Sequence, residues 1–415
     1  MSRSLLAAML IACLCAPLIA GAADWPQFRG PNADGFAPDK NINTDWTNRP
    51  PKELWRVTLS DDGYAGPSVA DGKVFIIDHD EKNPETKAYG KQAIVRALDL
   101  QTGQDVWRFT YENTANFNYG FTRSTPVYNN GKLYIQAELG TIYCLNAKTG
   151  AKIWERDIMQ AFAGKMPGWR LAMSPLIDGN KLIACPGGAD ASVVALNKET
   201  GETIWAGGGS EAPGYATPVV ATIDGKRQYL VFAKSLIMGV AADNGALLWS
   251  FPWKTGADVN ASAPIAISSN RVFISSAYNH GCCVLEVTNG QVRTVWQNLE
   301  IQAHFSTPLF YQGMLYCTSH FSGPGALVCL DPNDGTAKWK QPLFEKGGLV
   351  GVDGMMVVAD GKTGDVVLAK LDPTSYQELG RIKPLGGQSW TAPIIANGKL
   401  LVRNKSAMVC LDLSK

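Results

Sequence analysis

The side chains best suited to bind a ligand recur at one point of a repeated pattern. Each lies three to five residues before a proline that directly follows one or two small residues, as in Ser124-Thr125-Pro126. This short motif is called the proline step below. Aromatic rings, guanidinium groups, an amide and an imidazole could together hold a small molecule or a peptide. They could equally fill a channel and hydrogen-bond to one another. The seven residues are Tyr64, Arg123, Arg170, Tyr215, Asn260, His304 and Trp390.

A repeat of forty-odd residues must bring these side chains together. Six copies end in tryptophan, as in VRALDLQTGQDVW and IYCLNAKTGAKIW. In each copy an alternating apolar strand, a turn ending in glycine and a second short strand predict a β-hairpin. A degenerate copy, VVLAKLDPTSYQEL, and a truncated one, MVCLDL, follow. The six tryptophans lie 43 to 51 residues apart, at Trp107, Trp154, Trp205, Trp249, Trp296 and Trp339.

A second hairpin follows each small-residue and proline step, so one repeat supplies four strands, the content of a propeller blade. The last copy stops after its third strand, and ELWRVTL, with Trp55, supplies the missing fourth strand from the other end of the chain. The sequence therefore predicts an all-β, eight-bladed propeller of four-stranded antiparallel blades. We expect its N- and C-terminal strands to pair, which removes exposed sheet edges. We interpret the blade tryptophans as structural groups that seal neighbouring blades.

The first residues predict export. An apolar run, Leu5 to Ala20, precedes Ala20-Gly21-Ala22, the small residues that a signal peptidase requires. We expect residues 1–22 to be a signal peptide, 23–50 an N-terminal extension and 51–415 the propeller. A rival interpretation is a lipoprotein box, LIAC, with a lipid anchor at Cys13. Both place the protein in the periplasm or otherwise outside the cytoplasm, the second on the outer membrane, and neither leaves a transmembrane segment in the mature chain.

Composition excludes several classes of function. The 38 Lys and Arg residues balance 37 Asp and Glu, for a formal net charge of +1, so no basic excess attracts nucleic acid. The four histidines show no HxxxH or HExxH spacing, and no CxxC occurs. We therefore predict no metal site and no catalytic residue.

The cysteines make a further test of the strand register. Cys317 and Cys329 flank the hairpin turn of the sixth blade almost symmetrically, so we expect their side chains to face each other across neighbouring strands. Whether they form a disulfide stays open. Cys282 and Cys283 are interpreted as buried strand thiols.

The tail of each copy, of the form ALDxxTGxxxW, resembles the repeat of pyrroloquinoline quinone (PQQ) dehydrogenases and their cofactor-free, BamB-like relatives. The segment DWPQFRGPNADG, Asp24 to Gly35, is similar to the opening of exported bacterial PQQ-like propellers. The resemblance extends over essentially all residues from Asp24 to Lys415. It implies the propeller strongly and the chemistry weakly, because one fold serves many functions.

The resemblance implies two functions. One is a non-catalytic scaffold, BamB-like and linked to outer-membrane assembly, whose funnel meets a protein, peptide or glycan partner in the cell envelope. The other is a PQQ-dependent quinoprotein dehydrogenase that oxidises an alcohol or sugar. Arg123, Arg170 and Trp390 suit PQQ, but its calcium and its catalytic base need carboxylates, and the nearest is Asp258. The sequence therefore favours the scaffold, with no cofactor expected and PQQ with calcium as the alternative.

Overall fold

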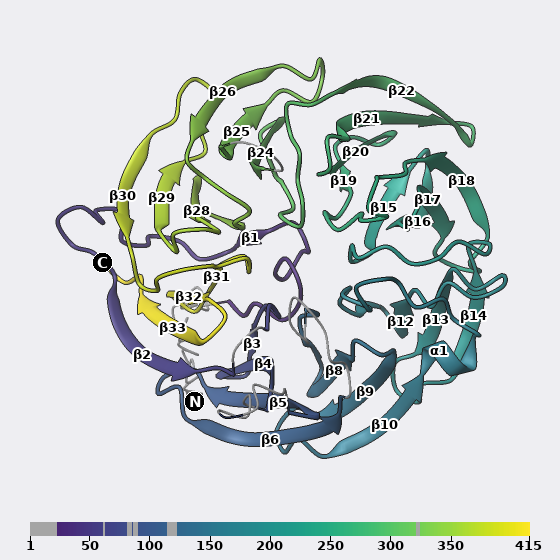
Figure 1. Ribbon diagram of the computed structural model, residues 1–415, viewed down its shortest axis with the longest axis horizontal. Coiled ribbons are helices and arrows are strands. Elements are labelled where there is room, and N and C mark those ends of the chain that lie inside the picture. The colour runs from purple at the N-terminus through teal and green to yellow at the C-terminus, as the bar shows by residue number, and fades with distance from the viewer. Residues whose placement is uncertain (1–22, 61–62, 81–84, 86–89, 114–122, 321–323) are drawn as a thin grey trace, which may run out of the picture.

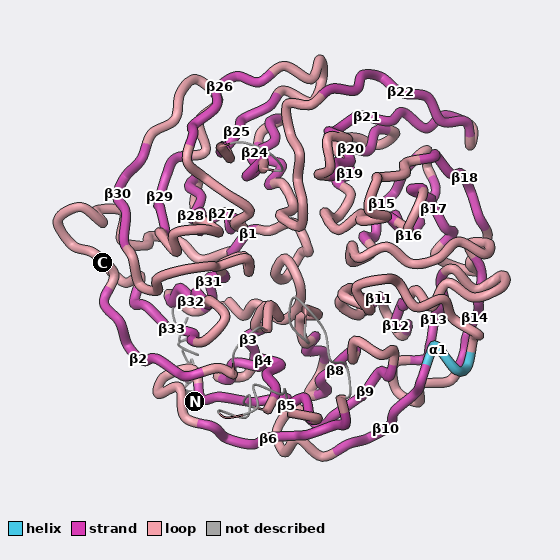
Figure 2. The backbone as a smooth tube through the Cα atoms, viewed as in Figure 1, coloured by secondary structure: helices cyan, strands magenta, loops and turns pink. Residues whose placement is uncertain are grey.

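Eight antiparallel sheets surround a central axis like the blades of a propeller (Figure 1). The computed structural model describes residues 23–60, 63–80, 85, 90–113, 123–320 and 324–415. Within these ranges strands and loops make up almost everything, as Figure 2 shows, and the one helix is α1 (Ile158–Ala161). The predicted all-β, eight-bladed propeller is confirmed.

The blades follow one another along the chain, each from its inner to its outer strand. Blade 1 is β3 (Ser68–Ala70), β4 (Lys73–His79), β5 (Gln92–Asp99) and β6 (Asp105–Glu112). Blade 2 is β7 (Val127–Asn129), β8 (Lys132–Gln136), β9 (Thr141–Asn146) and β10 (Lys152–Asp157). Blade 3 is β11 (Leu176–Asp178), β12 (Lys181–Ala184), β13 (Val193–Asn197) and β14 (Thr203–Gly207). Blade 4 is β15 (Val219–Ile223), β16 (Lys226–Phe232), β17 (Leu236–Ala241) and β18 (Leu247–Pro252).

The second half of the ring repeats the pattern. Blade 5 is β19 (Ile265–Ala266), β20 (Arg271–Ser276), β21 (Gly281–Thr288) and β22 (Gln291–Asn298). Blade 6 is β23 (Leu309–Tyr311), β24 (Met314–Ser319), β25 (Ala326–Leu330) and β26 (Ala337–Pro342). Blade 7 is β27 (Leu349–Val352), β28 (Met355–Ala359), β29 (Val366–Lys370) and β30 (Glu378–Ile382). Blade 8 is β31 (Ile394–Ala396), β32 (Lys399–Arg403), β33 (Ala407–Asp412) and β2 (Lys52–Thr58).

In every blade except blade 5, whose loop is longer, the first hairpin turns within two residues. Between β7 and β8 these are Asn130 and Gly131, with φ of 49° and 76°. A two-residue type I′ turn needs positive φ at both positions, and asparagine and glycine tolerate it best. The tight turn keeps the short inner strand next to the axis, where the residues before it can reach the centre.

The ring closes as the sequence predicts. β2 and β33 pair antiparallel in blade 8, with Trp55 opposite Cys410. The purple N-terminal strand thus forms the outer edge of the yellow C-terminal blade (Figure 1). Pairing between the two ends of the chain leaves no blade incomplete.

The blade tryptophans join neighbouring blades, as predicted. Trp107 of blade 1 lies against the turn glycine of blade 2, Gly150, where an added Cβ would approach the indole to 2.6 Å. Its Nε1 donates to the carbonyl of Ala147 at 3.1 Å. Trp55 makes the same kind of bond across the closing joint, to Leu100 at 2.9 Å. These indoles seal the joints between blades.

The N-terminal extension crosses the centre of the ring, which the sequence analysis did not foresee. Trp25 forms a bridge with Val69 in blade 1. Farther along, β1 (Phe36–Ala37) pairs in parallel with β27, with Phe36 opposite Gly351, and adds a fifth strand to the inner edge of blade 7. The extension therefore runs across the centre of the ring, where some of its residues line the central cavity (Figure 1).

One register prediction is wrong. In blade 6 Cys329 lies opposite Tyr316, and Cys317 lies opposite Val328. A shift of one residue moves a side chain to the other face of the sheet, so Cys317 and Cys329 point to opposite faces. Both are free and buried, as are Cys282 and Cys283 in β21, whose interpretation as buried strand thiols is confirmed.

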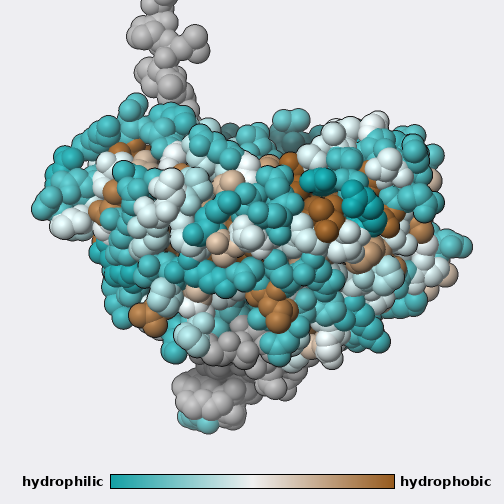
Figure 3. Space-filling model, turned by 90° about the horizontal axis from the view of Figure 1, so that it is seen from above, coloured by the Kyte–Doolittle hydropathy of each residue, from teal (hydrophilic) through white to brown (hydrophobic). Residues whose placement is uncertain are grey.

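Seen from the side, the wall of the ring is mostly hydrophilic, and its apolar residues form small, separate groups (Figure 3). Exposed apolar side chains on the outer strands include Leu54, Val106 and Ile153. This side therefore shows no broad apolar face on which a partner could dock.

Candidate functional site

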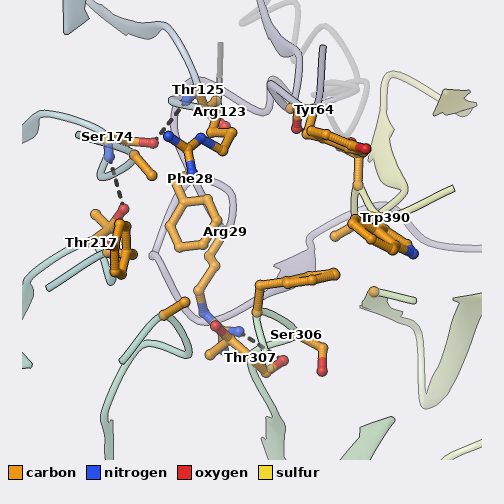
Figure 4. Close-up of a pocket in the computed structure, with 18 of the residues that line it drawn as sticks. Phe28, Arg29, Tyr64, Arg123, Thr125, Ser174, Thr217, Ser306, Thr307 and Trp390 are labelled. Carbon is orange, nitrogen blue, oxygen red and sulfur yellow. Dashed lines mark hydrogen bonds between the residues drawn. The ribbon is translucent and has the colours of Figure 1, made fainter. Parts of the chain in front are cut away.

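A cavity of about 460 Å³ lies at the centre of the ring, and all eight blades contribute to its wall (Figure 4). The wall consists of the residues that lead into each inner strand. The floor comes from the N-terminal extension: Trp25, Phe28, Arg29 and Gly35. Because the extension runs across the centre of the ring, these four residues form the floor of a central funnel.

Arg29 fixes the floor in place. Its guanidinium donates to the carbonyls of Asp34 at 2.7 Å, Pro308 at 2.9 Å and Thr307 at 3.3 Å, and its Nε to Ala33 at 3.2 Å. Burial lowers the pKa of Arg29 to about 10, which still leaves it charged at neutral pH. Its N–H groups are occupied by backbone oxygens, so Arg29 is a structural cation that ties the extension to blade 6.

The hydroxyl groups before the prolines also have structural partners. Ser174 Oγ accepts from the Thr125 N–H at 2.8 Å, and Thr217 Oγ1 accepts from the Ser174 N–H at 2.9 Å. Thr307 Oγ1 accepts from the N–H of Ala263 at 3.0 Å. The repeated small residue and proline thus link adjacent blades around the cavity (Figure 4).

Five of the seven residues singled out in the sequence line this one cavity. They are Tyr64, Arg123, Tyr215, His304 and Trp390. Their binding of a ligand stays a prediction, but the structure brings them together from five different blades, as Figure 4 shows for three of them.

The other two, Arg170 and Asn260, are not among the lining residues, although their neighbours Trp169, Val259 and Ala261 are. Asn260 is fully buried. Its amide donates to the carbonyls of Ala233 at 2.9 Å and Trp253 at 3.1 Å, and its Oδ1 accepts from Ser276 at 2.7 Å. Since its donors and acceptor are occupied by protein groups, Asn260 holds the backbone and does not offer an oxygen to a metal ion.

Aromatic rings form a continuous arc along one side of the cavity. Tyr64 stacks on Trp390 with 5.3 Å between ring centroids, and Phe305 lies 5.2 Å from Trp390. His304 continues the arc 4.8 Å from Phe305, and Tyr278 follows 5.2 Å from His304. The sequence analysis missed Phe305 and Tyr278. Phe305 lies three residues before Pro308, as Tyr64 does before Pro67, and could have been found by that criterion, whereas Tyr278 comes from a hairpin turn that the repeat does not mark.

The charged side chains among the described residues that line the cavity are all positive. Its lining includes Arg29, Arg123 and Lys346, and none of the described residues that line it is acidic. The Lys346 ammonium lies over the Trp390 ring, 5.4 Å from its centroid. Burial, then the charge of Lys346 and the proximity of His320, lower the pKa of His304 to about 4, so this imidazole is neutral at physiological pH. Its Nε2 lies 3.0 Å from the Tyr278 hydroxyl.

Arg123 differs from Arg29 because it lacks partners. Its Nε and Nη2 are buried without a hydrogen-bond partner among the described residues. Burial lowers its pKa. Glu138 lies close enough to influence Arg123 electrostatically but forms no ion pair with it within the described part of the chain. Glu138 instead accepts from Tyr111 at 3.3 Å and from the Asn113 amide.

Burial raises the pKa of Glu138 to about 7. A carboxyl with that pKa is partly protonated at neutral pH, so it supplies only part of a countercharge for Arg123. Nothing in the repeat pattern selects Glu138, since it lies in the turn between β8 and β9, away from the prolines.

Metal-binding groups do not gather anywhere in the described ranges, which hold no cluster of three His, Cys, Asp or Glu residues suited to a metal ion. Asp258, the carboxylate nearest to the funnel in sequence, forms an ion pair with Lys234 at 3.1 Å and does not line the cavity.

The fold and its repeat place the chain in the class of PQQ-like β-propellers. The chain belongs to the family described as outer membrane protein assembly factor BamB, whose model matches residues 91–341. In the part that the structure describes, the only helix has four residues, too short to cross a membrane.

Similar proteins fall into several functional groups. The BamB of Yersinia pestis is 23% identical over 345 residues, which span 78% of this chain and 80% of that protein. A tetrathionate hydrolase of Acidithiobacillus ferrooxidans is 24% identical over 258 residues, 57% of this chain, and the match spans only 48% of the hydrolase. The structure of a quinohemoprotein alcohol dehydrogenase from Comamonas testosteroni has a TM-score of 0.67 at 14% identity, covering 95% of this chain and 81% of the enzyme. At that identity the likeness shows the fold alone.

Proposed function

We propose that the protein is an exported, non-catalytic binding protein, BamB-like, that presents its central funnel to a protein, peptide or glycan partner in the cell envelope. The observation that carries this proposal is the make-up of the funnel. Its described lining offers aromatic and cationic groups for recognition, and none of the described lining residues is a carboxylate that could serve as an acid or a base. Membership of the BamB family supports a role in the envelope, with residues 1–22 removed on export.

The alternative, a PQQ-dependent dehydrogenase, has support from the likeness to a quinohemoprotein alcohol dehydrogenase. The residues present match the cofactor only in part. Arg123 and Lys346 could meet carboxylates, and Trp390 could stack on a flat ring. Calcium, however, prefers carboxylate and carbonyl oxygens, and the described residues that line the funnel include no carboxylate, while the Asn260 amide is occupied by other protein groups. Calcium-bound PQQ therefore does not suit this lining, and we assign no catalytic step to it.

The two functions separate in one experiment. The protein beginning at Ala23 is incubated with PQQ and calcium, and binding and alcohol-dependent dye reduction are measured. We expect no calcium-dependent binding and no dye reduction. Calcium-dependent, saturable binding together with dye reduction would overturn the proposal in favour of the dehydrogenase.

A positive test of the binding role uses a photo-crosslinking amino acid in cells. Trp169 lines the cavity and is 36% exposed, so a crosslinker there should capture an envelope partner. Val106, 49% exposed on the outer strand of blade 1, is the matched control. An adduct specific to position 169 supports the funnel as the recognition surface. Equal capture at both positions, or capture at Val106 only, contradicts it.

A further inference from the structure

The least satisfied polar group at the cavity is the guanidinium of Arg123. Arginine stays charged in proteins and carries five N–H donors. Here Nε and Nη2 are buried and have no partner among the described residues, unlike the donors of Arg29 in the floor. An unpaired buried charge is costly, and such a group in a native structure calls for an explanation.

Among the described residues, no carboxylate forms an ion pair with Arg123. None of the described lining residues is acidic, and Lys346 adds a second positive charge to the same cavity. Glu138 interacts electrostatically with Arg123, but its oxygens accept from Tyr111 and Asn113 and not from the guanidinium. An anionic molecule that enters the cavity would therefore meet N–H groups of Arg123 that no described residue occupies.

We propose that the funnel binds a small organic anion whose carboxylate pairs with Arg123 and whose flat body lies against the aromatic arc. This inference rests on the proposed function, since it names the chemical class of ligand that the funnel takes. A guanidinium pairs best with a carboxylate, through two parallel hydrogen bonds. The N–H groups of Arg123 that lack partners are available for that pairing.

The opposite side of the cavity suits a flat apolar face. Trp390 and Phe305 lie 5.2 Å apart in the arc, and Phe28 projects from the floor on the side of Arg123 (Figure 4). A volume of about 460 Å³ accommodates a small molecule or one end of a larger one. Two sources share this chemistry, an aromatic acid and a sugar acid with a flat C–H face, and the experiment distinguishes them.

Calorimetric titration of the protein beginning at Ala23 tests the proposal. The probes are 2-naphthoate and glucuronate, with the uncharged 2-naphthamide and glucose as matched controls. At least one acid should bind about 30-fold or more tightly than its neutral analogue, as expected when a buried charge pair loses one partner. Binding of naphthoate alone indicates an aromatic acid, and binding of glucuronate alone a sugar acid. Binding of neither, or equal binding of the neutral analogues, overturns the proposal.

Arg123→Leu then assigns the anion site. We expect the bound acid to lose about 30-fold or more in affinity, while Tm stays unchanged or rises because an unpaired charge has been removed. Arg293→Leu, at an exposed arginine on the outer strand of blade 5, is the control and should bind as the parent does. Arg123→Lys, which keeps the charge but loses the fork, should retain part of the affinity.

Unchanged binding by Arg123→Leu overturns the proposal. A marked fall in the Tm of Arg123→Leu also overturns it, because Arg123 would then be a structural residue. So does an Arg123→Lys variant that binds the acid no better than Arg123→Leu. Calorimetry with these acids involves no PQQ, calcium or dye, so its failure is distinguishable from failure of the proposed function.

Discussion

Tyr64 and Trp390 stack with 5.3 Å between ring centroids and 19° between ring planes, although they come from opposite ends of the propeller sequence. Tyr64 leads into blade 1 and Trp390 into blade 8, so the stack lies at the joint where the ring closes. Next to it, the Thr391 hydroxyl donates to the Tyr64 carbonyl at 2.9 Å. The joint that completes the fold therefore also forms part of the wall of the cavity.

Trp55→Ala should destabilise the whole ring by about 3–5 kcal/mol, as removal of a buried aromatic side chain usually does. Trp55 is 7% exposed and bonds to Leu100 across the closing joint. Leu54→Ala, next to it but 44% exposed, is the control and should change stability by less than about 0.5 kcal/mol. Urea unfolding followed by circular dichroism measures both. Equal effects of the two substitutions would show that the joint does not depend on the indole.

Arg29→Met should loosen the floor of the cavity. It removes four hydrogen bonds to backbone carbonyls, of which two belong to blade 6, and should cost about 3 kcal/mol. Chymotrypsin should then cut the extension at Trp25 or Phe28 faster than in the parent protein. Arg49→Met, at an exposed arginine, provides the comparison and should leave the cleavage rate unchanged. Protection of the extension in Arg29→Met would contradict the role assigned to this guanidinium.

Glu138→Gln should change how stability depends on pH. Burial raises the pKa of Glu138 from 4.5 to about 7, so the folded protein holds this proton more tightly than the unfolded chain. The stability contributed by the protonated form is fully present below about pH 4.5 and is lost as the pH rises through about 7. Relative to the variant, the parent should therefore lose roughly 3 kcal/mol between these pH values.

The free energies of unfolding of the parent protein and of Glu138→Gln are measured at pH 4.5 and at pH 8. The two should be nearly equal at pH 4.5, and the variant should be the more stable at pH 8. A difference that is independent of pH would mean that Glu138 is ionised throughout.

The cysteines should be unreactive in the folded protein. All seven described thiols are free and buried, and burial raises the pKa of Cys185, for example, to about 12. Alkylation of the protein beginning at Ala23 should therefore modify no thiol in buffer and all seven in denaturant, as read by mass spectrometry. A mass two units lower before reduction would reveal a disulfide and contradict this prediction, and a bond mapped to Cys317 and Cys329 would also contradict the register found in blade 6.

The sequence was sufficient for the ring because its signals repeat. The tryptophan tail and the proline step recur, so one misread copy does not change the fold, and the missing strand at the C-terminal end identified its partner around Trp55. The register of one hairpin, by contrast, depends on a single turn. The predicted register was wrong by one residue, and Cys317 and Cys329 therefore lie on opposite faces of the sheet. Periodicity carries no information about such a local detail.

Sequence reasoning found part of the cavity for the same reason. Tyr64 and Trp390 each lie three residues before a proline and come together, whereas Arg170 lies five residues before Pro175 and is not among the lining residues. The floor of the cavity could not be predicted from the repeats, because Phe28 and Arg29 lie in an extension that has no counterpart in them. Glu138 is notable only through its burial, which depends on how the blades pack.

A crystal structure of the protein with saturating 2-naphthoate, or with glucuronate if calorimetry selects the sugar acid, tests the central claim most directly. The account predicts density for the ligand in the central cavity, with its carboxylate about 3 Å from the nitrogens of Arg123 and its flat face against Trp390 or Phe305. A ligand bound elsewhere, or one that lies in the cavity with its carboxylate turned away from Arg123, would contradict the account.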